Sequence, residues 1–243
     1  TMELLGRSNY RTYALDFWGF GESGKKRETY NVSDFVSLVD QFMDLLGIES
    51  APLVGHSMGG TVSLSVAIHY PRRARKVVVI GSPIVGSSLA VLLKLAGYKP
   101  VAFAAHTFPV FLRLGLRLAA PFIARDPRFF PMISRDLSAT TLESFLFSIA
   151  SLRRTDLRPR LSEIRVPVLG IYGEGDNIVN PGEAHTLKTG LPDAQVARFE
   201  NCRHFPMLDT PDRFQQTLKS FLDGAAESSP ASGGSPQRAR ATR

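Results

Sequence analysis

The segment Leu53-Val54-Gly55-His56-Ser57-Met58-Gly59-Gly60 decides the fold, because a short apolar strand pattern breaks there at a glycine and restarts as a helix. The pattern G-x-S-x-G is typical of a nucleophile elbow, in which the serine lies at the tip of a sharp strand-to-helix turn. Small residues flank the serine because larger side chains would collide with the neighbouring backbone. The pattern therefore predicts a Ser57 hydroxyl held beyond the end of a strand.

The residues on either side of this turn support that interpretation. Residues 51–54 are strand-like, and residues 61–70 carry apolar side chains at the spacing of one helix face. The first N–H groups of such a helix point toward the serine, so the Met58 N–H is the predicted oxyanion donor. The alternative, a glycine-rich turn with a merely polar serine, is disfavoured because both flanks fit the elbow.

Composition indicates one globular domain with an insertion. The chain has 243 residues, of which 44% are hydrophobic and 21% charged, enough to form one substantial core. The single cysteine, Cys202, excludes an intrachain disulfide and a cysteine-based zinc site. The first seven residues show no secretory signal, so we expect a cytoplasmic location.

The net charge of +7 is concentrated in one segment. Residues 86–160 contain eleven of the 29 Lys and Arg residues but only four of the 22 Asp and Glu residues. These cations are interleaved with apolar residues and form no recognised nucleic-acid-binding motif. We therefore expect no nucleic-acid partner.

The rest of the chain alternates strand and helix patterns, which predicts an α/β fold with a parallel sheet covered on both faces. We expect strands at 11–17, 51–54, 76–80, 166–172 and 194–199, and helices at 3–8, 33–46 capped by Ser33 or Asp34, 61–70 and 212–222. The long, strand-poor stretch 86–164 is predicted to be a helical cap. The core then comprises 1–85 and 165–223, followed by a disordered tail at 224–243.

A serine nucleophile needs a base, and the base needs a third group that orients it. In open α/β sheets, reacting groups come from loops beyond the carboxyl ends of the strands. Asp176 follows the strand at 166–172, and His204 follows the strand at 194–199. We therefore predict a triad of Ser57, Asp176 and His204. Glu174 is the alternative acid, but Asp176 follows two glycines and is freer to turn toward the base.

The other histidines do not follow strand ends. His56 lies within the elbow, and we expect its side chain to point away from the nucleophile. His69 and His185 are expected on helices, and His106 is expected to be a structural residue of the cap.

Four segments together resemble the α/β-hydrolase family. They are Gly55-His56-Ser57-Met58-Gly59-Gly60, Gly173-Glu174-Gly175-Asp176, His204-Phe205-Pro206-Met207-Leu208 and Tyr13-Ala14-Leu15-Asp16-Phe17-Trp18-Gly19-Phe20-Gly21. The resemblance runs from about Glu3 to Leu222, and it implies a mostly parallel sheet flanked by helices, with a helical cap insertion. Family members that are epoxide hydrolases or dehalogenases carry an aspartate at the elbow, and Ser57 argues against both activities.

The resemblance also implies that the sheet is N-terminally incomplete. The family begins with further strands, and one of them ends in a His-Gly loop that supplies a second oxyanion N–H. This sequence shows no counterpart of that loop, and the strand that would separate residues 11–17 from the elbow strand is also missing. We therefore expect Met58 to supply one oxyanion donor, and a truncated gene model or a fragment would explain the missing second one.

The predicted cap is rich in apolar residues between positions 89 and 118, with Arg113 and Arg117 on one helix face. This pattern is typical of a helix with a solvated basic edge. The alternative is an apolar lid that contacts anionic lipid weakly through those arginines. The two charges, with Pro109 and Pro121 on either side, leave fewer than the ~20 apolar residues that a membrane span requires.

We expect a serine hydrolase that cleaves a small carboxylic ester with an apolar acyl or aromatic group, without metal or cofactor. The same triad would also serve a carbon–carbon bond hydrolase or an acyltransferase. A non-catalytic protein that binds lipid surfaces is the alternative from another class. The sequence assigns neither substrate-binding residues nor an oligomeric state.

Overall fold

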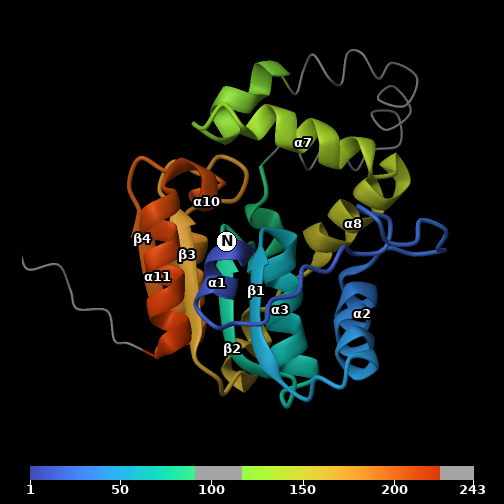
Figure 1. Cartoon of the computed structure of the whole chain (residues 1–243), viewed down its shortest axis with the longest axis vertical. Helices are drawn as coiled ribbons and strands as arrows, with labels where there is room; N and C mark the ends of the chain where they lie inside the picture. The colour runs from blue at the N-terminus through green and yellow to red at the C-terminus, as the bar shows by residue number, and fades with distance from the viewer. Residues whose placement is uncertain (91–116, 225–243) are drawn as a thin grey trace, which may run out of the picture.

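The structure is a computed structural model that describes residues 1–90 and 117–224. Within these ranges, four parallel strands form one sheet in the order β1-β2-β3-β4 (Figure 1). Their bounds are β1 (Ala51–His56), β2 (Ala74–Ile80), β3 (Val168–Gly173) and β4 (Gln195–Phe199). The predicted α/β fold with a parallel sheet is therefore confirmed.

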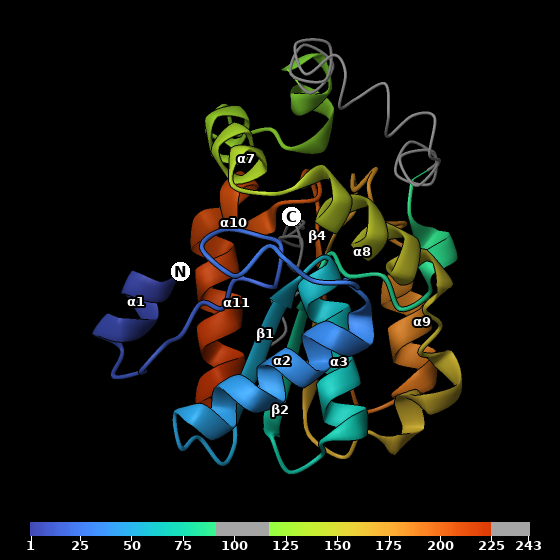
Figure 2. The same cartoon turned by 90° about the vertical axis from the view of Figure 1, so that its right-hand side faces the viewer.

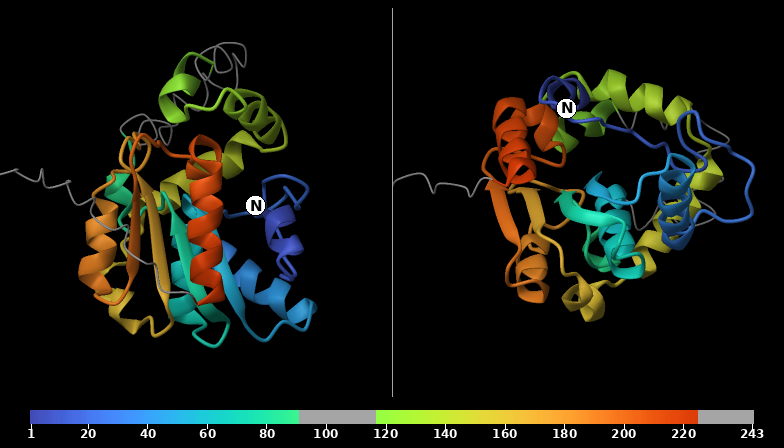
Figure 3. Two further views of the ribbon diagram at one scale, coloured as in Figure 1. Left: turned by 60° about the vertical axis from the view of Figure 1, so that its left-hand side comes forward. Right: turned by 60° about the horizontal axis from the view of Figure 1, so that its bottom comes forward.

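Helices cover both faces of this sheet. Figure 3 shows α1 (Met2–Arg7) and α11 (Pro211–Asp223) on one side, and α3 (Met58–His69) and α9 (Glu183–Gly190) on the other. Val77, Val78 and Val79 of β2 are fully buried as a result. Consecutive buried valines are what a parallel strand covered on both faces requires, because its side chains alternate between the two faces.

The predicted strand at residues 11–17 is wrong. The segment runs as an extended chain outside the sheet, and β1 pairs only with β2 among the described residues. A strand needs a neighbour for its N–H and C=O groups, and residues 1–90 and 117–224 provide none for this segment. It is held instead by aromatic contacts, including a stacked pair of Phe17 and Phe35 with ring centroids 4.6 Å apart. The free edge of β1 leaves Val54 42% exposed.

The predicted helix at 33–46 forms as α2 (Val32–Leu45), but the predicted cap is wrong. Its N-cap is Asn31, and the Asp34 carboxylate accepts the Asn31 N–H at 2.7 Å. Asp34 therefore belongs to the first turn, where a carboxylate is favourable next to the free N–H groups. Leu46 follows the helix and is exposed.

Between β2 and β3 the chain forms helices that lie over the carboxyl end of the sheet (Figures 1 and 2). They are the helical residues 117–123, α7 (Phe129–Ser138) and α8 (Leu142–Arg154), referred to here as the upper helices. Two short 3-10 turns, η1 (Gly86–Ser88) and η2 (Arg158–Glu163), flank the insertion. Its two ends are joined by backbone hydrogen bonds, since the Leu157 N–H donates to the Ile84 carbonyl at 3.0 Å.

The cap boundaries at 86 and 164 stay a prediction. Residues 91–116, which include His106 and Arg113, and the tail beyond Gly224 lie outside the described residues. In the part of the chain that the structure describes, no helix is both long enough and apolar enough to cross a membrane.

Candidate active site

Ser57 lies between the last residue of β1 and the first residue of α3. Its φ of 53° and ψ of −123° are rarely adopted by residues other than glycine, and such strain is typical of a nucleophile elbow. Two glycines make the tight turn possible. A Cβ on Gly55 would lie 2.2 Å from the Gly59 carbonyl, and one on Gly60 would lie 2.0 Å from the Ser82 hydroxyl. The local sequence thus folds as the elbow pattern predicts.

Met58 begins α3, so its N–H has no acceptor within the helix. The partial positive charge at the N-terminus of α3 strengthens the attraction of this N–H for an anion. This geometry fits the predicted oxyanion role of the Met58 N–H.

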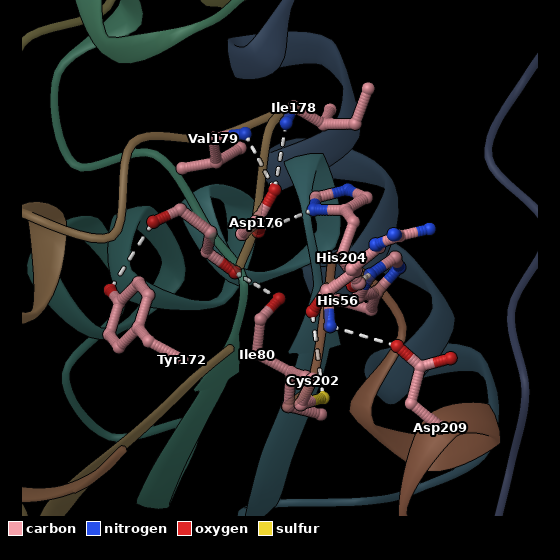
Figure 4. A network of polar contacts seen from close by, with 11 residues as sticks. His56, Ile80, Tyr172, Asp176, Ile178, Val179, Cys202, His204 and Asp209 are labelled. Atoms are coloured by element: carbon pink, nitrogen blue, oxygen red, sulfur yellow. Dashed lines mark hydrogen bonds and ion pairs between the residues drawn. The ribbon is translucent and has the colours of Figure 1, made fainter. Parts of the chain in front are cut away.

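Asp176 lies in the turn after β3 and is buried, with 7% of its surface exposed. Its Oδ1 accepts the N–H groups of Ile178 at 2.8 Å and Val179 at 3.0 Å, and its Oδ2 accepts a hydrogen bond from Nδ1 of His204 at 2.8 Å (Figure 4). Glu174, the alternative acid, is exposed. The structure therefore brings Asp176 against His204, and the contact leaves Nε2 of His204 free to accept a proton.

His204 follows β4 and is 4% exposed. Its main-chain N–H donates to the carbonyl of Ile123 in the upper helices at 3.2 Å. The preceding N–H, that of Arg203, donates to Oδ2 of Asp209 in α10 (Pro206–Asp209) at 2.8 Å. Oδ1 of Asp209 accepts the N–H of Arg125 at 2.7 Å. The loop that carries the base is thus held between the sheet and the upper helices.

Gly81 makes room for the acid–base pair. A Cβ at this position would lie 3.2 Å from both Oδ2 of Asp176 and Nδ1 of His204, and the φ of +51° also favours glycine. The residue before it, Ile80, accepts the Ser57 N–H at 2.8 Å. The elbow and the acid–base pair therefore meet at the carboxyl end of β2.

Ser57 is linked to Asp176 and His204 through the residues next to it, His56 and Ile80. Among the hydrogen bonds of the described residues there is none between the Ser57 side chain and His204. Nucleophile–base contacts are often long before substrate binds, so this does not conflict with the predicted roles. The structure thus joins Asp176 and His204 directly and places Ser57 at the carboxyl end of β1, which β2 separates from β3 in the sheet.

His56 is the residue that sequence reasoning missed. Its Nε2 lies 2.8 Å from the main-chain carbonyl oxygen of His204, and the two ring centroids are 4.6 Å apart. Burial first, and the nearby His204 second, lower the pKa of His56 to about 3. The ring is therefore neutral. The one feature of the sequence that could have indicated a role for His56 is its position directly before Ser57.

Apolar contacts join the base loop to the upper helices. The rings of Phe205 and Phe129 lie 4.8 Å apart, and Leu208 packs against the buried Ala120 and Ala124. Arg117 lies with its guanidinium 6.0 Å from the Phe130 ring centre. The base loop therefore contacts the upper helices through apolar side chains as well as through hydrogen bonds.

The remaining candidate groups lie outside this arrangement. His69 and His185 are on α3 and α9, as predicted. Burial raises the pKa of the Cys202 thiol to about 12, which makes it a poor nucleophile. Within residues 1–90 and 117–224, no group of three His, Cys, Asp or Glu side chains is placed to hold a metal ion. The absence of a cofactor stays a prediction.

Comparison with known proteins agrees with this architecture. A family model described as the alpha/beta hydrolase fold matches residues 1–211. The chain is 30% identical over 241 residues to a 2-hydroxy-6-oxononadienedioate/2-hydroxy-6-oxononatrienedioate hydrolase of Paraburkholderia phymatum, covering 91% of this chain and 79% of that one. It is 29% identical to a 2-hydroxy-6-oxo-6-phenylhexa-2,4-dienoate hydrolase of Burkholderia cepacia, covering 88% and 78%.

Among solved structures, the enol-lactonase from Burkholderia xenovorans LB400 is similar in fold. The TM-score is 0.73 at 24% sequence identity, with 86% of this chain and 79% of that one covered. The chain belongs to the α/β-hydrolase fold family, and its enzyme class is that of the hydrolases.

Proposed function

We propose that this chain is a serine hydrolase that cleaves a carboxylic ester, with Ser57 as nucleophile, His204 as base and Asp176 as the acid that orients His204. The observation that carries the proposal is the 2.8 Å contact between two buried side chains, Nδ1 of His204 and Oδ2 of Asp176. This contact fixes the tautomer in which Nε2 accepts a proton. A serine hydroxyl is reactive only with such a base, and the elbow lies at the same end of the sheet.

In the first half-reaction, Nε2 of His204 takes the proton of Ser57 while the serine oxygen bonds to the ester carbonyl carbon. The carbonyl electrons move to oxygen, and the Met58 N–H stabilises the oxyanion. The imidazolium of His204 then protonates the leaving alkoxide as the carbon–oxygen bond breaks. The products are an alcohol and an acyl group on Ser57, and the Asp176 carboxylate balances the imidazolium charge throughout.

In the second half-reaction, water takes the place of the alcohol. His204 accepts a proton from water while the water oxygen attacks the acyl carbon, and the bond to Ser57 breaks as the proton returns to the serine oxygen. The carboxylic acid leaves. An alcohol that attacked in place of water would give a new ester, and the chain would then be an acyltransferase.

The names of the two curated relatives favour a second candidate reaction. The compounds in those names carry a ketone at carbon 6 and no ester, so their hydrolysis breaks a carbon–carbon bond. The dienol would first ketonise, losing the proton of its 2-hydroxyl and gaining one at carbon 5, and Ser57 would then attack the carbon-6 ketone in the same way. As the bond between carbons 5 and 6 breaks, its electron pair would move into the conjugated 2-oxo group, and the imidazolium of His204 would supply the proton that gives the enol product. The apolar contacts of Phe205 and Phe129 above the base suit an apolar or aromatic group on the ketone.

The proposal is tested with a fluorophosphonate probe and a substrate panel. We expect the probe to label the wild-type chain and Ser37→Ala, a half-buried serine on α2, but not Ser57→Ala, which should lose at least about 10³-fold in activity. Short and long nitrophenyl esters, assayed beside a 2-hydroxy-6-oxodienoate, separate ester from carbon–carbon cleavage. A folded wild-type chain that is not labelled would contradict the proposal, and sedimentation of that chain with anionic liposomes would favour the lipid-binding alternative.

A further inference from the structure

The side chain of His56 connects the nucleophile elbow to the main chain of the base. A carbonyl oxygen only accepts hydrogen bonds, so the 2.8 Å contact requires a proton on Nε2 of His56, which donates to the His204 carbonyl. His56 is covalently bonded to Ser57, and 148 residues separate it from His204 along the chain. One hydrogen bond thus joins the backbones that carry the nucleophile and the base (Figure 4).

The His204 main chain is held on both sides by distant residues. The His56 side chain donates to its carbonyl, and its N–H donates to the Ile123 carbonyl at 3.2 Å. The side chain is held separately by Asp176. Of these three contacts, the one from His56 is the one that involves the elbow directly.

We propose that His56 is a positioning residue, whose donated hydrogen bond sets the distance between Ser57 and the base His204. The inference rests on the proposed function, because it concerns the same pair of residues. No direct hydrogen bond from Ser57 to His204 is present among the described contacts, so their separation depends on the main chains that carry them. A displacement of about 1 Å between reacting groups costs on the order of 10²-fold in rate.

The neutral state of His56 also matters for this role. During attack the His204 ring becomes a cation, and the His56 ring centroid lies 4.6 Å away. A second positive charge at that distance would oppose the imidazolium and weaken the base. The titratable groups that act on His56 are His204 and Asp176, and burial opposes its protonation most strongly. His56 therefore supplies an N–H donor without a charge.

The alternative is that His56 acts only by filling space against His204 and Phe205, whose ring centroid lies 4.6 Å away. Glutamine and methionine separate the two explanations, because their side chains have similar length and volume. The terminal amide of glutamine supplies an N–H near the position of Nε2, whereas methionine supplies no donor. A packing role treats the two substitutions alike, and a positioning role does not.

The test compares His56→Gln and His56→Met in the full chain. We measure the rate of fluorophosphonate labelling, the kcat and KM for a nitrophenyl ester, and the pH profile of kcat/KM. We expect His56→Met to lose 10-fold to 100-fold in labelling rate and kcat with KM little changed. His56→Gln should stay within about threefold of the wild type, with its pH profile unshifted, because the donor is restored.

Each outcome decides the inference. Equal losses of activity in His56→Gln and His56→Met would overturn it, and so would labelling of His56→Met at the wild-type rate. In both cases labelling of the wild-type chain would leave the proposed function intact. If the wild-type chain itself is not labelled, the proposed function fails, and the inference fails with it. Should His56→Met not fold, His56→Asn replaces it, because its amide is too short to reach the carbonyl.

Discussion

Asp176 and His204 touch each other, yet they are held in place by contacts of different range. Asp176 accepts the N–H groups of residues two and three positions further along its own turn. The main chain of His204 is bonded to Ile123 and to His56, which are far away in the sequence. Asp176, the proposed acid, is therefore positioned by its own loop, whereas His204, the proposed base, is positioned by the elbow and the upper helices.

Replacing one oxygen of the Asp176 side chain by nitrogen is enough to remove its hydrogen bond with His204. In Asp176→Asn, the amide oxygen still accepts from Ile178 and Val179, but the amide nitrogen faces Nδ1 of His204 and removes the acceptor. We expect kcat to fall by about 10³–10⁴-fold with the fold intact, because His204 takes the wrong tautomer. The measurement is ester hydrolysis, with circular dichroism as a check on folding.

Glu174→Gln is the matched control for this substitution, since Glu174 is exposed two residues earlier in the same turn. We expect its activity to stay within about twofold of the wild type. A comparable loss in both variants would mean that Asp176 is not the orienting acid.

Gly81→Ala disturbs both partners at once. The added Cβ would lie 3.2 Å from Oδ2 of Asp176 and from Nδ1 of His204, at a φ of +51°. We expect a loss of about 1–2 kcal/mol in the free energy of unfolding, from the backbone strain, and a fall of about tenfold or more in kcat/KM. Gly47→Ala is the control, because Gly47 has a φ of +64° and nothing within 4 Å of an added Cβ. Equal activity losses in the two variants would contradict a specific effect at the pair.

Asp209→Ala tests the base side alone. It leaves the N–H groups of Arg203 and Arg125 without their carboxylate acceptor. We expect the free energy of unfolding to fall by about 1–3 kcal/mol, measured by denaturant titration. We also expect kcat/KM to fall by about tenfold as the base loop shifts. Asp193→Ala, at an exposed position before β4, should change neither quantity, and wild-type activity in Asp209→Ala would show that the base needs no support from the upper helices.

The remaining expected effect is a pH dependence of stability that comes from His56, one of the titratable supports of the base loop. The pKa of His56 is about 3 in the folded chain, against an ordinary value of 6.5. Between these values the unfolded chain binds more protons at this site, so His56 makes stability fall as pH falls. We expect His56→Gln to lose less stability than the wild type from pH 7 to pH 4 in thermal melts. Parallel stability curves would show that His56 is not buried in its neutral form.

The difference between contacts within one loop and contacts between distant residues also explains what could be predicted from the sequence. The elbow around Ser57 and the acid turn at Asp176 are local patterns, and the structure has both where they were predicted. The strand at residues 11–17 depended on a neighbour that a local pattern does not report, and it does not form. His56 was set aside because it lies within the elbow, and its contact with His204, which spans 148 residues, is one that a local pattern does not report. Asp209 was not singled out either, since its partner Arg125 is 84 residues away.

The hydrogen bond from His204 to Ile123 has a consequence for protein engineering. Exchanging the upper helices between related enzymes is an obvious way to alter substrate range, with breakpoints at the paired chain ends near Ile84 and Leu157. In this chain such a chimera would also replace the backbone that places the Ile123 carbonyl against His204 and the Arg125 N–H against Asp209. A graft that retains residues 123–126 from the recipient would keep both, and the donor sequence is then best joined on either side of that short segment.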